Sequence, residues 1–241
     1  MTTFTKYIVA LVISLLMMSC IFDSSLISGI EGNGNLITQE RPIDNFNQIK
    51  VSRGLQVYLT QSENLKLVVE ADENLHDIIM TKVQNKILHI YADENIRSSK
   101  AKKVMVNFNT LENLKITSGS HILGMNNFKL ENIAIDASSG GQIDVEIDAK
   151  VIECDASSGS LIKLTGSANT FYADASSGSS IRANDLQTKI SNVEASSGAN
   201  IRVNSSEELV AKATSGANVK YYGNPIKLTK KNGVSGSINK D

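Results

Sequence analysis

Ala137-Ser138-Ser139-Gly140 is the first of four identical strings, and the others stand at 156–159, 175–178 and 195–198. From residue 118 on, a Ser-Gly pair recurs seven times, with steps of 21, 19, 19, 20, 18 and 20 residues between successive glycines. Helical repeats need more than about 30 residues, whereas a shorter repeat built from alternating segments is typical of a β-solenoid. The sequence therefore predicts an all-β fold, a single-chain parallel β-helix or β-solenoid with coils of about 20 residues.

Apolar residues stand at odd offsets on both sides of each glycine. Around Gly159 they are Cys154, Ala156, Ile162 and Leu164, and the same offsets are apolar in coil after coil. This period of two indicates half-buried strands. Stacked coils would place equivalent residues about 4.8 Å apart, as apolar ladders inside the solenoid. The serine before each glycine shares the odd parity, so we expect it to point inward and to hydrogen-bond near a corner.

The part of the chain before the repeats follows a weaker version of the same rule. Gly54 is flanked by apolar residues at the same offsets of three and five. We expect residues 38–110 to form less regular β coils that run into the regular solenoid of residues 111–241. A small separate β domain is the alternative. Residues 20–37 are rich in Ser, Gly and Asn and are expected to form a tether.

The first twenty residues differ from the rest. An almost unbroken apolar run extends from Tyr7 to Met18, which is too short to span a bilayer but fits the core of a signal peptide. The run ends at Ser19-Cys20, which resembles a lipobox, although lipoboxes prefer leucine where Met17 stands. We expect residues 1–19 to be a lipoprotein signal peptide and Cys20 to carry a thioether-linked lipid. An ordinary secretory signal or an uncleaved anchor is the alternative.

Three segments carry a family resemblance. They are residues 46–61 (FNQIKVSRGLQVYLTQ), residues 69–74 (VEADEN) and the serial Ala-Ser-Ser-Gly units. Together they resemble the DUF2807 family, described as "putative auto-transporter adhesin, head GIN domain", over most of the mature chain. The resemblance implies a secreted or lipidated β-helical protein of a kind common in Bacteroidetes. It implies a fold more firmly than a function, and it carries over no catalytic residue.

Even offsets face solvent, and two of these columns are charged. Four places before the glycines stand four acidic residues, Asp136, Asp155, Asp174 and Glu194. Four places after them stand four basic residues, Lys163, Arg182, Arg202 and Lys220. The acidic column is a candidate for gathering cations such as Ca²⁺, and the basic column for following an anionic polysaccharide or lipid head group. Two solvated faces are the simpler interpretation, and one carboxylate per coil does not close a calcium cage, so we expect no bound metal.

No catalytic motif is present in the sequence. His76, His89 and His121 share no motif, and no phosphate loop, nucleophile elbow or metal-type cluster occurs. With Cys20 lipidated, Cys154 has no partner for a disulfide, and its place in an apolar column makes it a core residue. The 24 basic and 25 acidic side chains also argue against a nucleic-acid-binding protein. We expect no enzyme and no cofactor.

The sequence as a whole predicts a non-enzymatic cell-envelope lipoprotein. The N-terminal lipid would hold it at the outer membrane, facing either the periplasm or the outside. The solenoid would offer a surface for adhesion, with glycans or other envelope proteins as partners. The alternatives are a β-helical polysaccharide-active enzyme of the lyase kind, and a purely structural envelope protein.

Overall fold

The computed structural model describes residues 28–241, so the predicted signal peptide and Cys20 lie outside the described residues. The described chain consists of β-strands joined by turns and short loops, with one short 3-10 turn at Glu73–Leu75. Its regular part contains ten strands, β10 (Asn113–Ile116), β11 (His121–Lys129), β12 (Asn132–Ala137), β13 (Gln142–Ala156), β14 (Leu161–Ala175), β15 (Ser180–Ala195), β16 (Asn200–Ala213), β17 (Asn218–Tyr222), β18 (Lys227–Asn232) and β19 (Ser237–Lys240).

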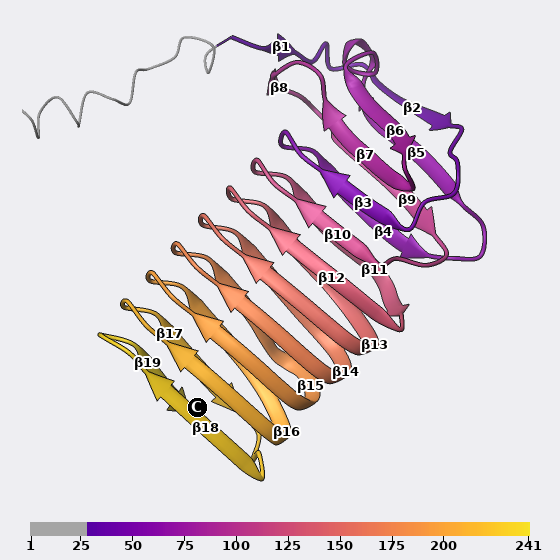
Figure 1. The fold of residues 1–241 in the computed structure, drawn as a ribbon. Coiled ribbons are helices and arrows are strands. Elements are labelled where there is room, and N and C mark those ends of the chain that lie inside the picture. The colour runs from indigo at the N-terminus through magenta and orange to yellow at the C-terminus, as the bar shows by residue number, and fades with distance from the viewer. Residues whose placement is uncertain (1–27) are drawn as a thin grey trace, which may run out of the picture.

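Successive coils stack in parallel, as Figure 1 shows. From the Gly119 coil to the Gly216 coil, residues at the same offset from the glycine are partners in neighbouring strands: Ala137 pairs with Ala156, and Ile143 pairs with Ile162. In the last coil the register moves by one residue, and Val219 pairs with Ile238. Strands before the glycine form one stack and strands after it form another, because β12 pairs with the end of β13 whereas β11 pairs with its beginning. The predicted parallel β-solenoid is therefore confirmed.

The core lies between the two stacks of strands. The apolar residues at odd offsets are buried in every regular coil, including Cys154, Ala156, Ile162 and Leu164. Each large aliphatic side chain buried in such a ladder contributes about 1.5–3 kcal/mol relative to its exposed state. In five coils the buried residue three places before the glycine is alanine, whereas the buried residue three places after it is isoleucine or valine. Near the turn, a small residue on one stack is therefore combined with a large residue on the other.

A tight turn connects the two stacks in each coil. Ser158 and Gly159 have φ angles of 52° and 70°, and the amide of Ser160 donates to the carbonyl of Ser157 at 3.2 Å. Two positive φ angles in succession are the mark of a type I′ turn, in which glycine is favoured because it has no Cβ. The turns form a row of loops along one edge (Figure 1), and the amide of Gly159 donates to the carbonyl of Ser177 in the next coil at 3.1 Å.

The serine before each glycine does not point inward, so that expectation is wrong. Ser158 lies at the exposed tip of the turn. The buried hydroxyl belongs instead to the residue after the glycine: Ser160 donates to the carbonyl of Ala137 at 2.9 Å and accepts the amide of Ser157 at 3.1 Å. Two successive residues in the left-handed region interrupt the alternation of inward and outward side chains along the strand. The direction of a side chain beyond the turn therefore cannot be deduced by counting residues from the strand before it.

The N-terminal part continues the same solenoid with a changed strand order. Strands β3 (Gln48–Val51) and β4 (Gln56–Gln61) form a coil that pairs in parallel with β10 and β11. Strands β7 (Ile87–Ala92) and β9 (Lys102–Phe108) form the next coil outward, paired with β3 and β4. All these strands belong to the 17-stranded sheet that contains the regular coils.

Antiparallel strands cover the N-terminal end. Strand β5 (Lys66–Asp72) pairs with β9, β2 (Leu36–Arg41) pairs with β5, and β6 (Ile79–Gln84) pairs with β7, all antiparallel. The short β1 (Ile30–Glu31) pairs with β8 (Ile96–Ser98). The structure therefore pairs part of the 20–37 segment, predicted as a tether, with the folded body.

Candidate functional site

The acidic column forms one continuous row on the outer face of the strands before the turn. Asp136 on β12 pairs in register with Asp155 on β13, Asp155 with Asp174 on β14, and Asp174 with Glu194 on β15. The spacing between paired strands places these carboxylates about 4.8 Å apart. A lysine bounds the row on each side, because Asp136 also pairs with Lys115 and Glu194 with Lys212. The structure thus brings all four predicted acidic residues together.

A row of hydroxyl groups runs beside these carboxylates. From Thr117 to Thr214, the residues two places before the glycines are half-buried, and four of them line a groove together with the acidic row, namely Ser138, Ser157, Ser176 and Ser196. The groove has a volume of about 490 Å³. At its N-terminal end the hydroxyl of Ser138 donates to the hydroxyl oxygen of Thr117 at 3.2 Å. Each coil therefore supplies one carboxylate and one hydroxyl group to the same groove.

Burial and neighbouring carboxylates raise the pKa of both aspartates in the middle of the row. Burial and the neighbouring carboxylates of Asp136 and Glu153 raise the pKa of Asp155 above its ordinary value. Burial, Asp155 and Glu194 do the same to the pKa of Asp174. Glu194 alone in this row forms an ion pair within the described residues, with Lys212 at 2.6 Å. The middle of the groove therefore carries negative charge that no cation of the described chain neutralises directly.

An aromatic ring stands next to the groove. Tyr172 lies two residues before Asp174 on the same outer face of β14, and 44% of its surface is exposed. A large exposed aromatic side chain beside polar groups offers a flat apolar surface with a polar end. Neither this tyrosine nor the hydroxyl row was predicted from the sequence, although the recurrence of Ser or Thr two places before the glycines is visible there.

The basic column lies on the outer face of the strands after the turn. Lys163, Arg182, Arg202 and Lys220 are partners in register on β14, β15, β16 and β17. Ion pairs occupy the two ends of this row: Lys163 contacts Asp144 at 2.9 Å, and Lys220 contacts Asp241 at 3.0 Å. Among residues 28–241, Arg182 and Arg202 have no ion-pair partner within 4.0 Å. Because the core lies between the two stacks, the acidic and basic rows face away from each other.

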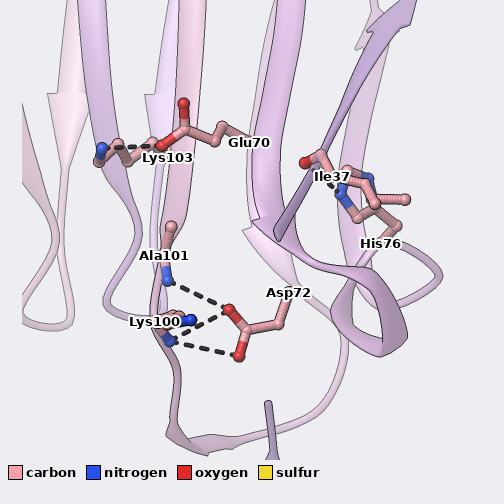
Figure 2. Close-up of polar contacts among 7 residues, drawn as sticks. All are labelled: Ile37, Glu70, Asp72, His76, Lys100, Ala101 and Lys103. Atoms are coloured by element: carbon pink, nitrogen blue, oxygen red, sulfur yellow. Dashed lines mark hydrogen bonds and ion pairs between the residues drawn. The ribbon is translucent and has the colours of Figure 1, made fainter. Parts of the chain in front are cut away.

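A separate polar cluster holds the N-terminal cap together (Figure 2). Asp72 is 1% exposed, and its carboxylate accepts the backbone amides of Lys100, Ala101 and Gly34 at 3.1–3.2 Å. Burial opposes the charge, but these hydrogen bonds outweigh it and lower the pKa of Asp72. Nearby, Lys103 pairs with Glu70 at 2.8 Å. All the acceptor capacity of Asp72 is used within the fold, so we assign the cluster a structural role.

The described chain contains no arrangement typical of a catalytic centre. His76 follows the 3-10 turn, with Nε2 3.2 Å from the carbonyl oxygen of Ile37, whereas His89 and His121 lie on β7 and β11. Burial raises the pKa of the Cys154 thiol well above its usual range, and Asp155 and Asp136 raise it further. Within residues 28–241, no group of three or more His, Cys, Asp or Glu side chains is placed to hold a metal ion. The described residues also contain no helix that could cross a membrane.

Several solved structures share this fold. A putative adhesin from Bacteroides fragilis has a TM-score of 0.81 and 22% identity, over 88% of this chain and 100% of that one. A putative lipid binding protein from Parabacteroides distasonis has a TM-score of 0.73 and 22% identity, over 88% and 99%. A putative adhesin from Parabacteroides merdae has a TM-score of 0.69 and 20% identity, over 89% and 100%. At these identities the likeness shows the fold alone.

No curated protein matches the sequence. The family model described as "putative auto-transporter adhesin, head GIN domain" matches residues 45–225, which include the coil around Gly54 and the regular coils as far as β17. This match extends over most of the described solenoid and includes both charged rows. The chain therefore belongs to the DUF2807 family of adhesin-like proteins.

Proposed function

We propose that this protein is a non-enzymatic adhesin-like lipoprotein of the cell envelope, anchored through Cys20 and presenting the side of its solenoid to a partner. The apolar run before Cys20 supports export and anchoring. The adhesin-like family supports an extracellular or surface-exposed location. The unbroken solenoid supports a contact role, because an extended stack of coils offers a long regular surface for binding.

The groove beside the acidic row is the proposed contact surface. The observation that carries this assignment is the alignment of four carboxylates with four hydroxyl groups in one groove of about 490 Å³. Carboxylates accept hydrogen bonds from ammonium and hydroxyl groups and repel anions. The groove therefore selects a partner rich in cationic or hydroxyl groups, such as an amino-sugar or neutral glycan. It does not suit the acidic polysaccharides on which lyases act.

A binding assay with defined glycans tests this proposal. The full chain, inserted into vesicles of uncharged phosphatidylcholine, is passed over immobilised amino-sugar polymer, neutral glucan and polygalacturonate. We expect retention on the first two and least on the third. The double variant Asp155→Asn/Asp174→Asn should lose most of the retention. The matched control Glu40→Gln/Glu131→Gln removes two carboxylates outside the groove and should not.

Equal retention of the two double variants would show that the groove is not the contact surface. Absence of retention on every surface would overturn the proposed glycan contact. The anchor is tested separately: Cys20→Ser should abolish incorporation of radiolabelled palmitate and release the protein from the membrane fraction. Continued incorporation in Cys20→Ser would contradict the assignment of Cys20.

A further inference from the structure

Along successive coils, the two charged rows of this chain carry matching series of charges with opposite signs. From β10 to β16 the row before the turn contains, in successive coils, one cation, four anions and one cation, which are Lys115, Asp136, Asp155, Asp174, Glu194 and Lys212. From β13 to β17 the row after the turn contains one anion and four cations, which are Asp144, Lys163, Arg182, Arg202 and Lys220. One row is therefore the charge complement of the other.

Both rows also have the same spacing, because the same coils carry them. A second copy laid alongside the first can therefore match them along their full length. A shift of one coil places Asp155 opposite the partner's Arg182, and Asp174 opposite the partner's Arg202. The same shift places Asp136 and Glu194 opposite the two terminal lysines of the basic row. Without the shift, like charges meet at both ends, Asp136 with Asp144 and Lys212 with Lys220.

The side chains in the middle of both rows lack ion pairs of their own. Arg182 and Arg202 have no ion-pair partner within residues 28–241, and neither have Asp155 and Asp174, whereas both ends of the basic row are already paired within the chain. Like charges in register on neighbouring strands repel one another. An opposite row from another molecule would relieve both repulsions at once, and electrostatic complementarity of this kind fixes register and partner choice.

We propose that a second copy of this chain docks laterally, with its basic row in the acidic groove of the first copy. This inference rests on the proposed function, because it names the cationic partner of the same groove. The two rows face away from each other on each molecule, so the contact is heterologous and does not close. Repetition would produce a row of copies side by side, as open heterologous contacts do.

A charge-exchange experiment tests the inference. Two differently tagged full-length copies are co-expressed, solubilised in mild detergent and purified through one tag. Wild-type copies should co-purify, and 0.5 M salt should release them because such contacts are screened. Asp155→Arg/Asp174→Arg should lower self-co-purification about tenfold or more, and so should Arg182→Asp/Arg202→Asp. Co-expression of these two variants should restore it, because each then supplies the row that the other lacks.

The control is Lys66→Asp, which reverses a charge in the N-terminal cap and should leave co-purification unchanged. Wild-type copies that do not co-purify would overturn lateral docking. Reversal variants that each still self-associate would also overturn it, as would two variants that fail to restore each other although both show wild-type circular dichroism. Glycan retention by the vesicle-bound chain without co-purification would reject this inference and leave the proposed function standing.

Discussion

Replacement of Gly159 by alanine isolates the cost of the turn geometry. The glycine has a φ of +70°, and a Cβ built on it would meet no atom within 4 Å. The substitution therefore causes no steric overlap with neighbouring coils. An L-residue in the left-handed region costs about 1–2 kcal/mol. Alanine also lowers the conformational entropy of the unfolded chain, which stabilises the folded state by about 0.4–1 kcal/mol. We expect a net loss of about 1 kcal/mol in the free energy of unfolding.

Urea unfolding followed by circular dichroism measures this loss as a lower midpoint at unchanged slope. Gly159→Asn is the matched control, because asparagine enters the left-handed region far more readily, and it should cost less than alanine. Gly166→Ala should cost more than Gly159→Ala, because Gly166 has a φ of +105° and its Cβ would overlap the backbone of Ile147. If Gly159→Ala left the midpoint unchanged, or if asparagine were as harmful as alanine, the assignment of a left-handed turn would be refuted.

Three further predictions concern the buried aspartate of the cap, the acidic row and the core cysteine. Asp72→Asn should lower the free energy of unfolding by about 1.5–3 kcal/mol at pH 7, because three backbone amides lose a charged acceptor. Since the fold lowers the pKa of Asp72, the advantage of the wild type should be lost as the pH falls through the folded-state pKa. Equal urea midpoints of wild type and variant at pH 7 would refute this prediction. Asp155→Asn/Asp174→Asn should raise the free energy of unfolding by about 0.2–1 kcal/mol at pH 7, because it removes repulsion between carboxylates in register. Since the fold raises the pKa of both aspartates, this gain should disappear below the ordinary carboxyl pKa, where the wild-type side chains are protonated in both states. A gain that persists in acid would contradict the charge repulsion. Cys154 should resist alkylation by iodoacetamide until the chain unfolds, and rapid labelling of the native protein would place it outside the core.

The regular coils could be predicted from the sequence because alternation in strands has a period of two, and a recurring glycine fixes the register. Ile143, Ile162 and Ile181 are recognisable as one ladder by their offset alone, and the structure pairs them. The same counting failed at Ser158, because two left-handed residues reset the direction of the side chains. Parity is thus reliable within a strand and unreliable across a turn.

The N-terminal cap could not be predicted, because its contacts join segments that are distant in the sequence. The Gly- and Asn-rich stretch around Gly32 has the composition of a linker. In the structure, a Cβ at Gly32 would overlap the carboxylate of Asp72, so this glycine permits a close approach. No local pattern distinguishes a glycine of this kind from one in a flexible segment. Two of the three amides that surround Asp72, those of Lys100 and Ala101, come from a loop 28 and 29 residues later.

The charged rows were visible in the sequence, but the groove was not. The offsets of Asp155 and Arg182 from their glycines predicted two outward columns, and the structure places both in register. The groove depends on how the wall with Ser157 meets the turn, which no spacing encodes. Tyr172 was missed for a similar reason, because it occurs in only one coil and no repetition marks it.

The stacked register rests on six Ser-Gly units, from Ser118-Gly119 to Ser215-Gly216, that form the same turn in successive coils. In the last coil the turn lies one residue earlier, and the amide of Gly236 donates to the carbonyl of Gly233. Spin labels on cysteines introduced at the exposed turn tips test the stacked register by pulsed electron paramagnetic resonance. With one label at Ser215 and the other at Ser118, Ser139 or Ser158, we expect separations of about 24, about 19 and about 14 Å, in equal steps of about 4.8 Å per coil. Distances that do not fall in equal steps from pair to pair would contradict the stacked register, and with it both charged rows.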